Sequence, residues 1–114
     1  MSPQHIVKTE VKGTLGIISL AGDFSGSSED LVMNAYAYVS GAGATRILLR
    51  CMPGFYVNSA GIAVLIMMVS EARRKNQKVG AVGLSQHFQK IFEMIGLTDY
   101  VTLFQNEEAA IKGF

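Results

Sequence analysis

The chain has 114 residues, which predicts a single domain spanning residues 1–114. Its formal charge of +1 excludes the strongly basic surface of proteins that coat DNA or RNA, so we expect no nucleic-acid partner. The single cysteine excludes an internal disulfide framework and favours a reducing compartment. The longest apolar run, residues 62–69, is too short to cross a bilayer, so we expect no direct membrane insertion. Residues 1–5 lack the features of a signal peptide, and we therefore expect a cytoplasmic protein.

The first third of the chain predicts two strands and a helix. Apolar and polar residues alternate over residues 5–12, which is typical of a half-exposed edge strand. Gly13 and Thr14 predict a tight turn into a second strand, residues 15–21, so that an antiparallel hairpin closes at Gly22. The hydroxyls of Ser27 and Ser28, followed by two acidic residues, predict the start of a helix that ends near residues 41–43.

The rest of the chain alternates between strands and helices. Residues 46–50 and 78–83 are short and mostly apolar, as expected for strands buried in a parallel sheet, and residues 100–104 are a last candidate strand. Residues 51–58 predict a loop. Three helices are predicted by apolar periodicity and capping residues, at residues 59–76, 85–95 and 107–113.

This order of elements predicts an α/β domain. Strands that alternate with helices imply parallel crossovers, and the initial hairpin adds antiparallel pairing. We therefore expect a mixed sheet of four or five strands, with four helices packed mainly on one face. The predicted core is drawn from both strands and helices: Ile17, Leu20, Ile47, Leu49, Ile62, Leu65, Val82, Phe92 and Ile95.

The sequence offers few candidates for catalysis or metal binding. Neither His5 nor His87 has neighbours at metal-ligand spacing, and no glycine pair has the spacing of a phosphate-binding loop. We therefore expect no metal, no cofactor and no catalytic residue. Ser59 lies at a loop-to-helix junction, as a hydrolase nucleophile does, but Val57 stands where that motif needs glycine. A serine hydrolase is therefore the least favoured of three functions.

Residues 47–65 resemble the signature of the STAS family, which is named after sulfate transporters and anti-sigma factor antagonists. In that family a buried strand leads through a short loop into Asp-Ser-Ser/Thr-Gly at the head of an apolar helix. This chain has Asn58-Ser59-Ala60-Gly61 at that place. Residues 20–24, 78–84 and 92–110 are also similar to the family pattern, so the resemblance extends over most of the chain.

The resemblance implies a regulator that acts by binding and is not an enzyme. In stand-alone bacterial members, the first serine of the motif is phosphorylated by an anti-sigma factor that is also a serine kinase of the histidine-kinase-like ATPase type. The unphosphorylated antagonist binds this anti-sigma factor and frees the sigma factor for transcription, and phosphorylation breaks the complex (partner switching). Ser59 matches the phosphorylated serine. The implied partner-binding surface consists of Asp23, Phe24, Ser25, Met52, Phe55, Tyr56, Asn58, Ser59, Ala60 and Gly61.

Four positions depart from the family pattern and remove carboxylates from the site. Asn58 replaces the aspartate of the motif, and Arg50 replaces the aspartate that usually ends the preceding strand. Ala60 replaces the second hydroxyl residue, and Ser25 stands where many antagonists carry aspartate. These departures favour an alternative function: a STAS scaffold or adaptor subunit of a signalling complex or a lipid transport system, without a phosphorylation cycle.

Ser59 also has a purely structural interpretation. We expect its hydroxyl to cap the helix by accepting a hydrogen bond from a backbone amide, a contact worth about 1 kcal/mol. The same helix N-terminus would stabilise a phosphate, and Arg50 could pair with that phosphate if its side chain emerges beside it. The sequence leaves the oligomeric state open, with a homodimer among the alternatives.

Overall fold

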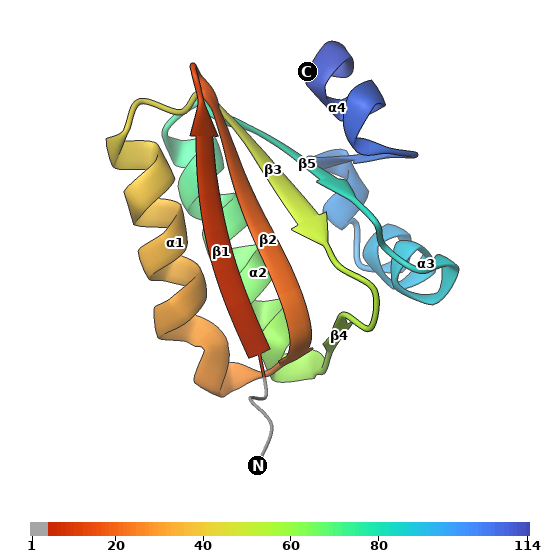
Figure 1. The fold of residues 1–114 in the computed structure, drawn as a ribbon. Helices are drawn as coiled ribbons and strands as arrows, with labels where there is room; N and C mark the ends of the chain where they lie inside the picture. The colour runs from red at the N-terminus through yellow and green to blue at the C-terminus, as the bar shows by residue number, and fades with distance from the viewer. Residues whose placement is uncertain (1–4) are drawn as a thin grey trace.

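The computed structural model describes residues 5–114 and begins with a long antiparallel hairpin (Figure 1). Its strands are β1 (His5–Lys12) and β2 (Leu15–Phe24). The sequence predicted that the second strand ends at residue 21, but β2 continues to Phe24. It continues because Gly22 adopts a φ of 92°, which glycine allows, and still pairs with His5. Residues 1–4, from which the absence of a signal peptide was argued, lie outside the described residues.

Three further strands extend the sheet from β2 in parallel. They are β3 (Arg46–Cys51), β5 (Lys78–Val82) and β6 (Val101–Phe104), and the order across the sheet is β1-β2-β3-β5-β6. A sixth strand, β4 (Tyr56–Val57), lies off this path and pairs with the end of β2. The sequence predicted only a loop there, because two residues are too few to show alternation. The predicted mixed α/β sheet is confirmed.

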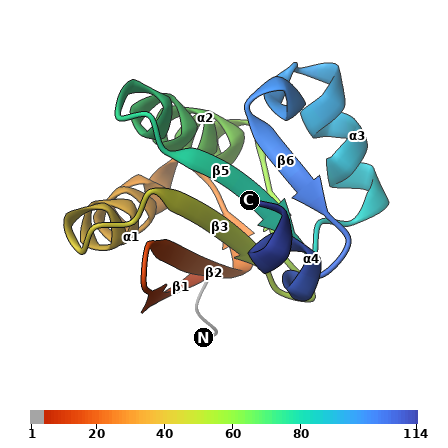
Figure 2. The ribbon, with the colours of Figure 1, turned by 90° about the horizontal axis from the view of Figure 1, so that it is seen from above.

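Three helices cover one face of the sheet and the fourth lies on the other face (Figure 2). On the first face are α1 (Glu29–Gly41), α2 (Ser59–Arg74) and α3 (Gln86–Met94). On the other face is α4 (Glu107–Gly113), whose Ala110 packs on a small cluster from β2, β3 and β5. Two short 3₁₀ turns precede α1 and β6. None of the helices within residues 5–114 is long and apolar enough to cross a membrane.

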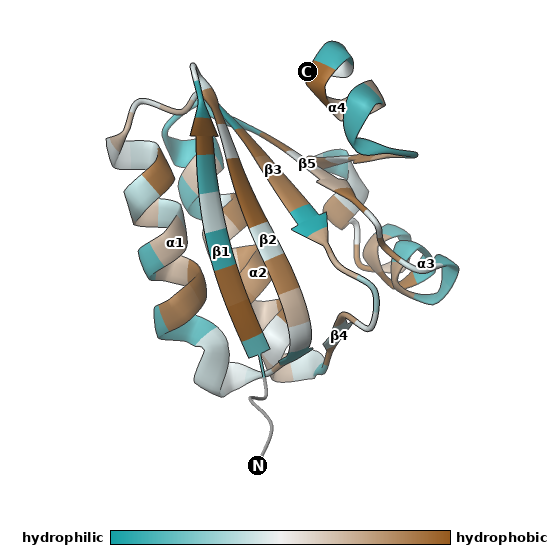
Figure 3. Cartoon of the chain, in the orientation of Figure 1, coloured by the Kyte–Doolittle hydropathy of each residue, from teal (hydrophilic) through white to brown (hydrophobic). Residues whose placement is uncertain are grey.

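The predicted core is confirmed at seven of its nine positions, which are buried, and the hydrophobic residues concentrate along β2 and β3 (Figure 3). Ile62 is half-buried and packs against the main cluster. The prediction for Ile95 was wrong, because its side chain is 48% exposed. Helix α3 ends at Met94, and Gly96 turns the chain away with a φ of 79°. Ile95 therefore lies beyond the last helical turn that packs on the sheet.

Candidate functional site

The predicted site forms where the ends of β2 and β4 meet the start of α2. The amide of Asn58 donates a hydrogen bond of 3.1 Å to the carbonyl oxygen of Phe24, and β4 pairs with Asp23 and Phe24. The 3₁₀ turn after β2 (Gly26–Ser28) also packs on α2, because a Cβ at Gly26 would lie 3.4 Å from that of Ala60. The structure therefore brings the β2 end, the loop before α2 and the first turn of α2 together at one end of the molecule (Figure 1).

Asn58, and not Ser59, caps helix α2. The backbone of Asn58 is extended, and its Oδ1 accepts a hydrogen bond of 2.9 Å from the amide of Gly61. The expectation that Ser59 is the cap was wrong, because asparagine is an equally good capping residue and stands one position earlier. Ser59 is instead the first helical residue. Its side chain is exposed, and within residues 5–114 its hydroxyl makes no hydrogen bond.

Removing this cap is expected to weaken the helix start. We expect Asn58→Ala to lower the free energy of unfolding by about 1 kcal/mol, because the amide of Gly61 loses its acceptor. Ser59→Ala is the matched control and should change stability much less. Chemical denaturation of both variants measures the difference, and equal losses would contradict the assignment of the cap to Asn58.

Gly61 fixes the distance between α2 and the end of β2. A Cβ at this position would lie 2.5 Å from the carbonyl oxygen of Phe24 and 2.6 Å from Cγ2 of Val57. Only glycine allows so close an approach of a helix to a strand backbone. Gly61 is buried, so it contributes to the surface by positioning Ser59 and Ala60, which are exposed.

An aromatic cluster supports the loop that precedes α2. The ring centroids of Phe24 and Phe55 are 5.5 Å apart, and those of Phe55 and Phe88 are 5.9 Å apart. Phe24 and Phe55 are buried. These two predicted binding residues therefore pack in the interior beneath the loop and stabilise it. Their side chains offer little surface to a partner.

One apolar side chain remains accessible beside this cluster. Tyr56 packs edge-on against Phe88 at 5.6 Å but keeps 53% of its surface exposed. Met52 is also exposed, but it lines a cavity with Ser19 and Arg50 on the opposite face of the sheet, so the structure does not bring this predicted binding residue to Ser59. An exposed aromatic side chain is typical of the core of a protein–protein interface. Tyr56, Ser59 and Ala60 form an accessible surface at the start of α2, which we call the Ser59 surface.

A carboxylate remains beside the Ser59 surface, although the sequence departures suggested that none was left. Asp23 is exposed and lies in the strand pair opposite Tyr56. Ser25 is half-buried, and its hydroxyl caps the 3₁₀ turn by accepting a hydrogen bond from the amide of Ser27. Ser25 therefore shapes the loop between β2 and α1 that lies against Ala60.

Arg50 lies on the face of the sheet opposite α2. Its guanidinium donates hydrogen bonds of 2.7 Å to each carboxylate oxygen of Glu107, one of 2.9 Å to Glu10 and one of 3.1 Å to Ser19. Its neighbour Leu49 packs toward the helices, and successive strand residues point to opposite faces. The expectation that Arg50 pairs with a phosphate on Ser59 was therefore wrong. No local pattern in the sequence indicates this ion cluster, because it joins β1, β3 and α4.

This cluster makes stability depend on pH. The hydrogen bonds from Arg50 lower the pKa of Glu107 from its ordinary value of 4.5. A lowered pKa in the folded state means that the stabilisation is present above about pH 4.5 and is lost as the pH falls through the lowered value. We expect Glu107→Gln to cost about 1 kcal/mol at pH 7, since the pair is partly exposed, and nothing at low pH. Urea denaturation at both pH values tests this, with Glu108→Gln as the control that should change little at either.

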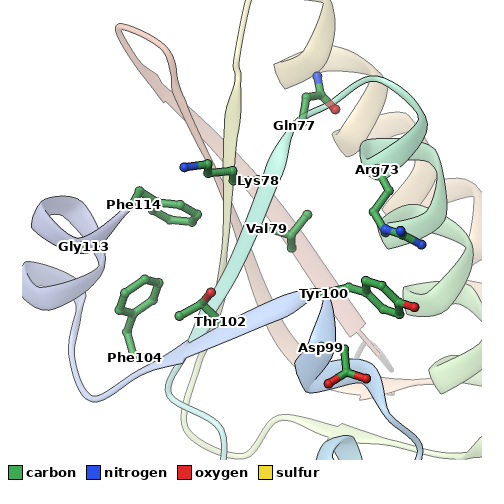
Figure 4. Close-up of a pocket in the computed structure, with 10 residues that line it drawn as sticks. All are labelled: Arg73, Gln77, Lys78, Val79, Asp99, Tyr100, Thr102, Phe104, Gly113 and Phe114. Atoms are coloured by element: carbon green, nitrogen blue, oxygen red, sulfur yellow. The ribbon is translucent and has the colours of Figure 1, made fainter.

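A separate cavity of about 410 Å³ lies beside β5 and β6 (Figure 4). Its lining includes Arg73, Lys78, Tyr100 and Phe114, and none of the predicted binding residues. Arg73 lies 3.9 Å from the centre of the Tyr100 ring. The cationic end of α2 is thus partly engaged by its own neighbours.

The structure offers little for metal or thiol chemistry. Within residues 5–114 no group of histidine, cysteine and acidic residues is arranged to hold a metal ion. Cys51 is buried, and burial raises the pKa of its thiol to about 12. Because the thiolate is the reactive form, Cys51 is inert at neutral pH.

The chain is similar in fold to several anti-sigma factor antagonists of known structure. One from Mycobacterium paratuberculosis is 14% identical, with a TM-score of 0.80 over 98% of this chain and 96% of that one. The antagonist SpoIIAA in its unphosphorylated form is 15% identical, with a TM-score of 0.73 over 94% and 96% of the two chains. The Bacillus cell fate determinant SpoIIAA in its phosphorylated form is 17% identical, with a TM-score of 0.70 over 96% and 100%.

The family of the chain is established by a match to a protein-family sequence model. The sequence identities to the solved structures are too low to establish more than similarity in fold. A search of curated proteins finds no match. The family model described as "Mlab, STAS domain" matches residues 7–105, which include the Ser59 surface and the whole sheet except the start of β1. The chain therefore belongs to the STAS domain family.

Proposed function

We propose that this chain is an anti-sigma factor antagonist that acts in the cytoplasm by binding. The Ser59 surface binds an anti-sigma factor, and phosphorylation of Ser59 by that partner releases it. The observation that carries the proposal is the Ser59 hydroxyl, which is exposed, makes no hydrogen bond within residues 5–114 and lies on the same surface as the exposed Tyr56. The similarity in fold to antagonists, among them SpoIIAA in both phosphorylation states, supports it.

The position of Ser59 suits a reversible charge switch. A phosphate there adds about −1.5 to −2 charges at the N-terminus of α2, where the helix dipole and the first backbone amides stabilise negative charge. The free protein therefore tolerates the modification. A partner packed on Tyr56 would have to bury the same charge against apolar groups, which is unfavourable. The phosphate thus acts on the complex and leaves the fold intact.

The direct test is phosphorylation by a serine kinase of the anti-sigma type. The chain is incubated with the kinase and ATP, and its mass is read. We expect one added phosphate that is absent in Ser59→Ala and still present in the matched control Ser27→Ala, which removes another exposed hydroxyl. Phosphate at another residue, or none with any kinase of this type, would overturn the switch.

A second candidate is a STAS scaffold or adaptor without a phosphorylation cycle. It is favoured by the capping role of Asn58, because an aspartate there could both cap the helix and contribute charge, whereas Asn58 only caps. Under this function the Ser59 surface still binds a partner, but Ser59→Ala and the native chain bind equally and neither takes up phosphate. The kinase experiment therefore separates the two candidates.

We also expect no hydrolytic activity from Ser59. An unactivated hydroxyl is a weak nucleophile, and activation needs a base within hydrogen-bond reach. His5 is engaged elsewhere, with its Nδ1 3.1 Å from the hydroxyl of Ser28. An esterase assay on activated esters should give equal rates for the native chain and Ser59→Ala. A rate that Ser59→Ala abolishes would contradict the binding function.

A further inference from the structure

The outer edge of β1 is open to another strand. β1 stands at one end of the sheet, and within residues 5–114 no strand pairs with its outer side. Its eight residues present a row of backbone amides and carbonyls to solvent, which is a template for strand addition. β1 also alternates between hydrophilic and hydrophobic residues along its length (Figure 3).

The alternation gives β1 two distinct faces. Lys8 and Glu10 lie on the face that carries Arg50, because Glu10 accepts a hydrogen bond from Arg50 there. Val7, Thr9 and Val11 lie on the face toward α1, where Val7 packs against the main core. One face of the edge strand is therefore charged and the other is mostly apolar.

We propose that β1 pairs antiparallel with β1 of a second copy of this chain, about a two-fold axis at Thr9. In this register Lys8 lies opposite the partner's Glu10, and the symmetry repeats this pair on the other side of the axis. Val7 lies opposite the partner's Val11, also twice, and Thr9 faces the partner's Thr9. Opposite charges and β-branched residues facing each other are the cross-strand pairs that stabilise antiparallel strands. The interface is isologous, as closed dimers require.

Registers centred on the neighbouring residues of β1 are unfavourable. An axis at Lys8 would place it against the partner's Lys8, and an axis at Glu10 would place two carboxylates together. An axis between two residues would set side chains of opposite faces against each other. An axis at Thr9 also aligns residues 6–12 of both strands, which is nearly all of β1.

Helix α1 supports the same axis through its exposed outer flank. Tyr36 donates a hydrogen bond to Gln77, just after the C-terminal end of α2, and so marks the side of α1 toward α2. At 3.6 residues per turn, Leu31 and Tyr38 lie on the opposite side of α1. Both are exposed, Tyr38 by 61%, and they are unusually large apolar side chains for a solvent-facing flank.

The position of these two residues along α1 matches the proposed two-fold axis. Just before α1, Ser28 contacts His5 at the start of β1. Near the other end of α1, Val39 packs against Gly16, which pairs with Val11 in the hairpin. Thr9 therefore lies level with the middle of α1, between Leu31 and Tyr38. A two-fold axis at Thr9 then brings Leu31 near the partner's Tyr38 on both sides. Because the two β1 strands run antiparallel, the two Ser59 surfaces would lie toward opposite ends of the dimer, and the dimer is independent of the proposed function.

A charge-swap series tests the pairing. Lys8→Glu places a second carboxylate against the partner's Glu10 on both sides of the axis, and we expect the dimer dissociation constant, measured by analytical ultracentrifugation, to rise tenfold or more. Lys12→Glu is the matched control, since it makes the same charge change on the same face but lies opposite the partner's Ile6, and should have little effect. The double variant Lys8→Glu with Glu10→Lys restores opposite charges across the axis and, although it removes the Glu10 contact of Arg50, should dimerise more tightly than Lys8→Glu alone. Circular dichroism melting confirms that each variant is folded.

Cross-linking tests the register itself. Thr9→Cys places two thiols across the axis at about 4.5–5.5 Å between Cα atoms, within disulfide range, whereas native Cys51 is buried. We expect mild oxidation to link Thr9→Cys into a dimer and to leave Lys12→Cys monomeric under denaturing electrophoresis. A native chain that stays monomeric at 100 μM or above, or equal cross-linking of the two cysteine variants, would overturn the proposal.

Discussion

Truncating Leu65 to alanine is expected to lower the free energy of unfolding by about 2–5 kcal/mol, the cost of removing buried methyl groups and leaving a cavity. Leu65 is 2% exposed and lies on the inner side of α2, in the cluster that the sheet and three helices share. Leu49, equally buried in β3, contributes to the same cluster from the sheet side, and Leu49→Ala should cost a similar amount. Urea denaturation of each variant measures the loss.

The next residue along α2 provides the control. Ile66 has the same number of carbon atoms but lies on the exposed side of the helix. Ile66→Ala should cost little, because alanine has the higher helix propensity and little packing is lost. Equal losses for Leu65→Ala and Ile66→Ala would contradict the assignment of the inner and outer sides of α2, and with it the placement of Ser59.

The second large effect concerns binding. We expect Ser59→Glu to weaken the complex with an anti-sigma factor by about 2 kcal/mol, roughly 30-fold in Kd, because it introduces a charge into the contact beside the exposed Tyr56. The melting temperature should hardly change, since the N-terminus of α2 stabilises a negative charge in the free protein. Isothermal titration calorimetry and thermal melting measure the two quantities separately.

Two variants show whether charge at this position is the cause. Ser59→Gln has nearly the shape of Ser59→Glu without its charge and should bind more tightly. Ala63→Glu places the same carboxylate one turn further along α2, where Ala63 is also exposed, and maps how far the contact extends. Equal weakening by Ser59→Gln and Ser59→Glu would assign the loss to side-chain size and contradict the charge switch.

Local sequence pattern predicted the fold well, because most elements are long enough to show their periodicity. The hairpin, the buried strands and the amphipathic α3 each carry a repeat of hydrophobic residues that matches their geometry. Capping and glycine residues also predicted the start of α2, whereas the proposed binding site there rests on the resemblance to the STAS family. Pattern failed where an element was too short, as in β4, or where a periodic run outlasted its helix, as at Ile95.

The details of the site depended on contacts between distant segments. In the sequence Arg50 stands a few residues before the start of α2. Its contacts with Glu10 and Glu107 nevertheless hold its side chain on the face of the sheet opposite α2. Ser59 and Asn58 are both good capping residues, and only backbone geometry decides which of them caps. That choice leaves the Ser59 hydroxyl exposed at the start of α2, which no residue pattern alone could establish.

The most direct test of the partner switch compares the enzymatically phosphorylated chain with the unmodified chain. Both are titrated with the same anti-sigma factor, after mass analysis has placed the phosphate on Ser59. The proposed function predicts tight binding by the unmodified chain, and a Kd at least roughly 30-fold higher for the phosphorylated chain, by the same charge argument as for Ser59→Glu. Equal Kd values for the two forms would contradict it.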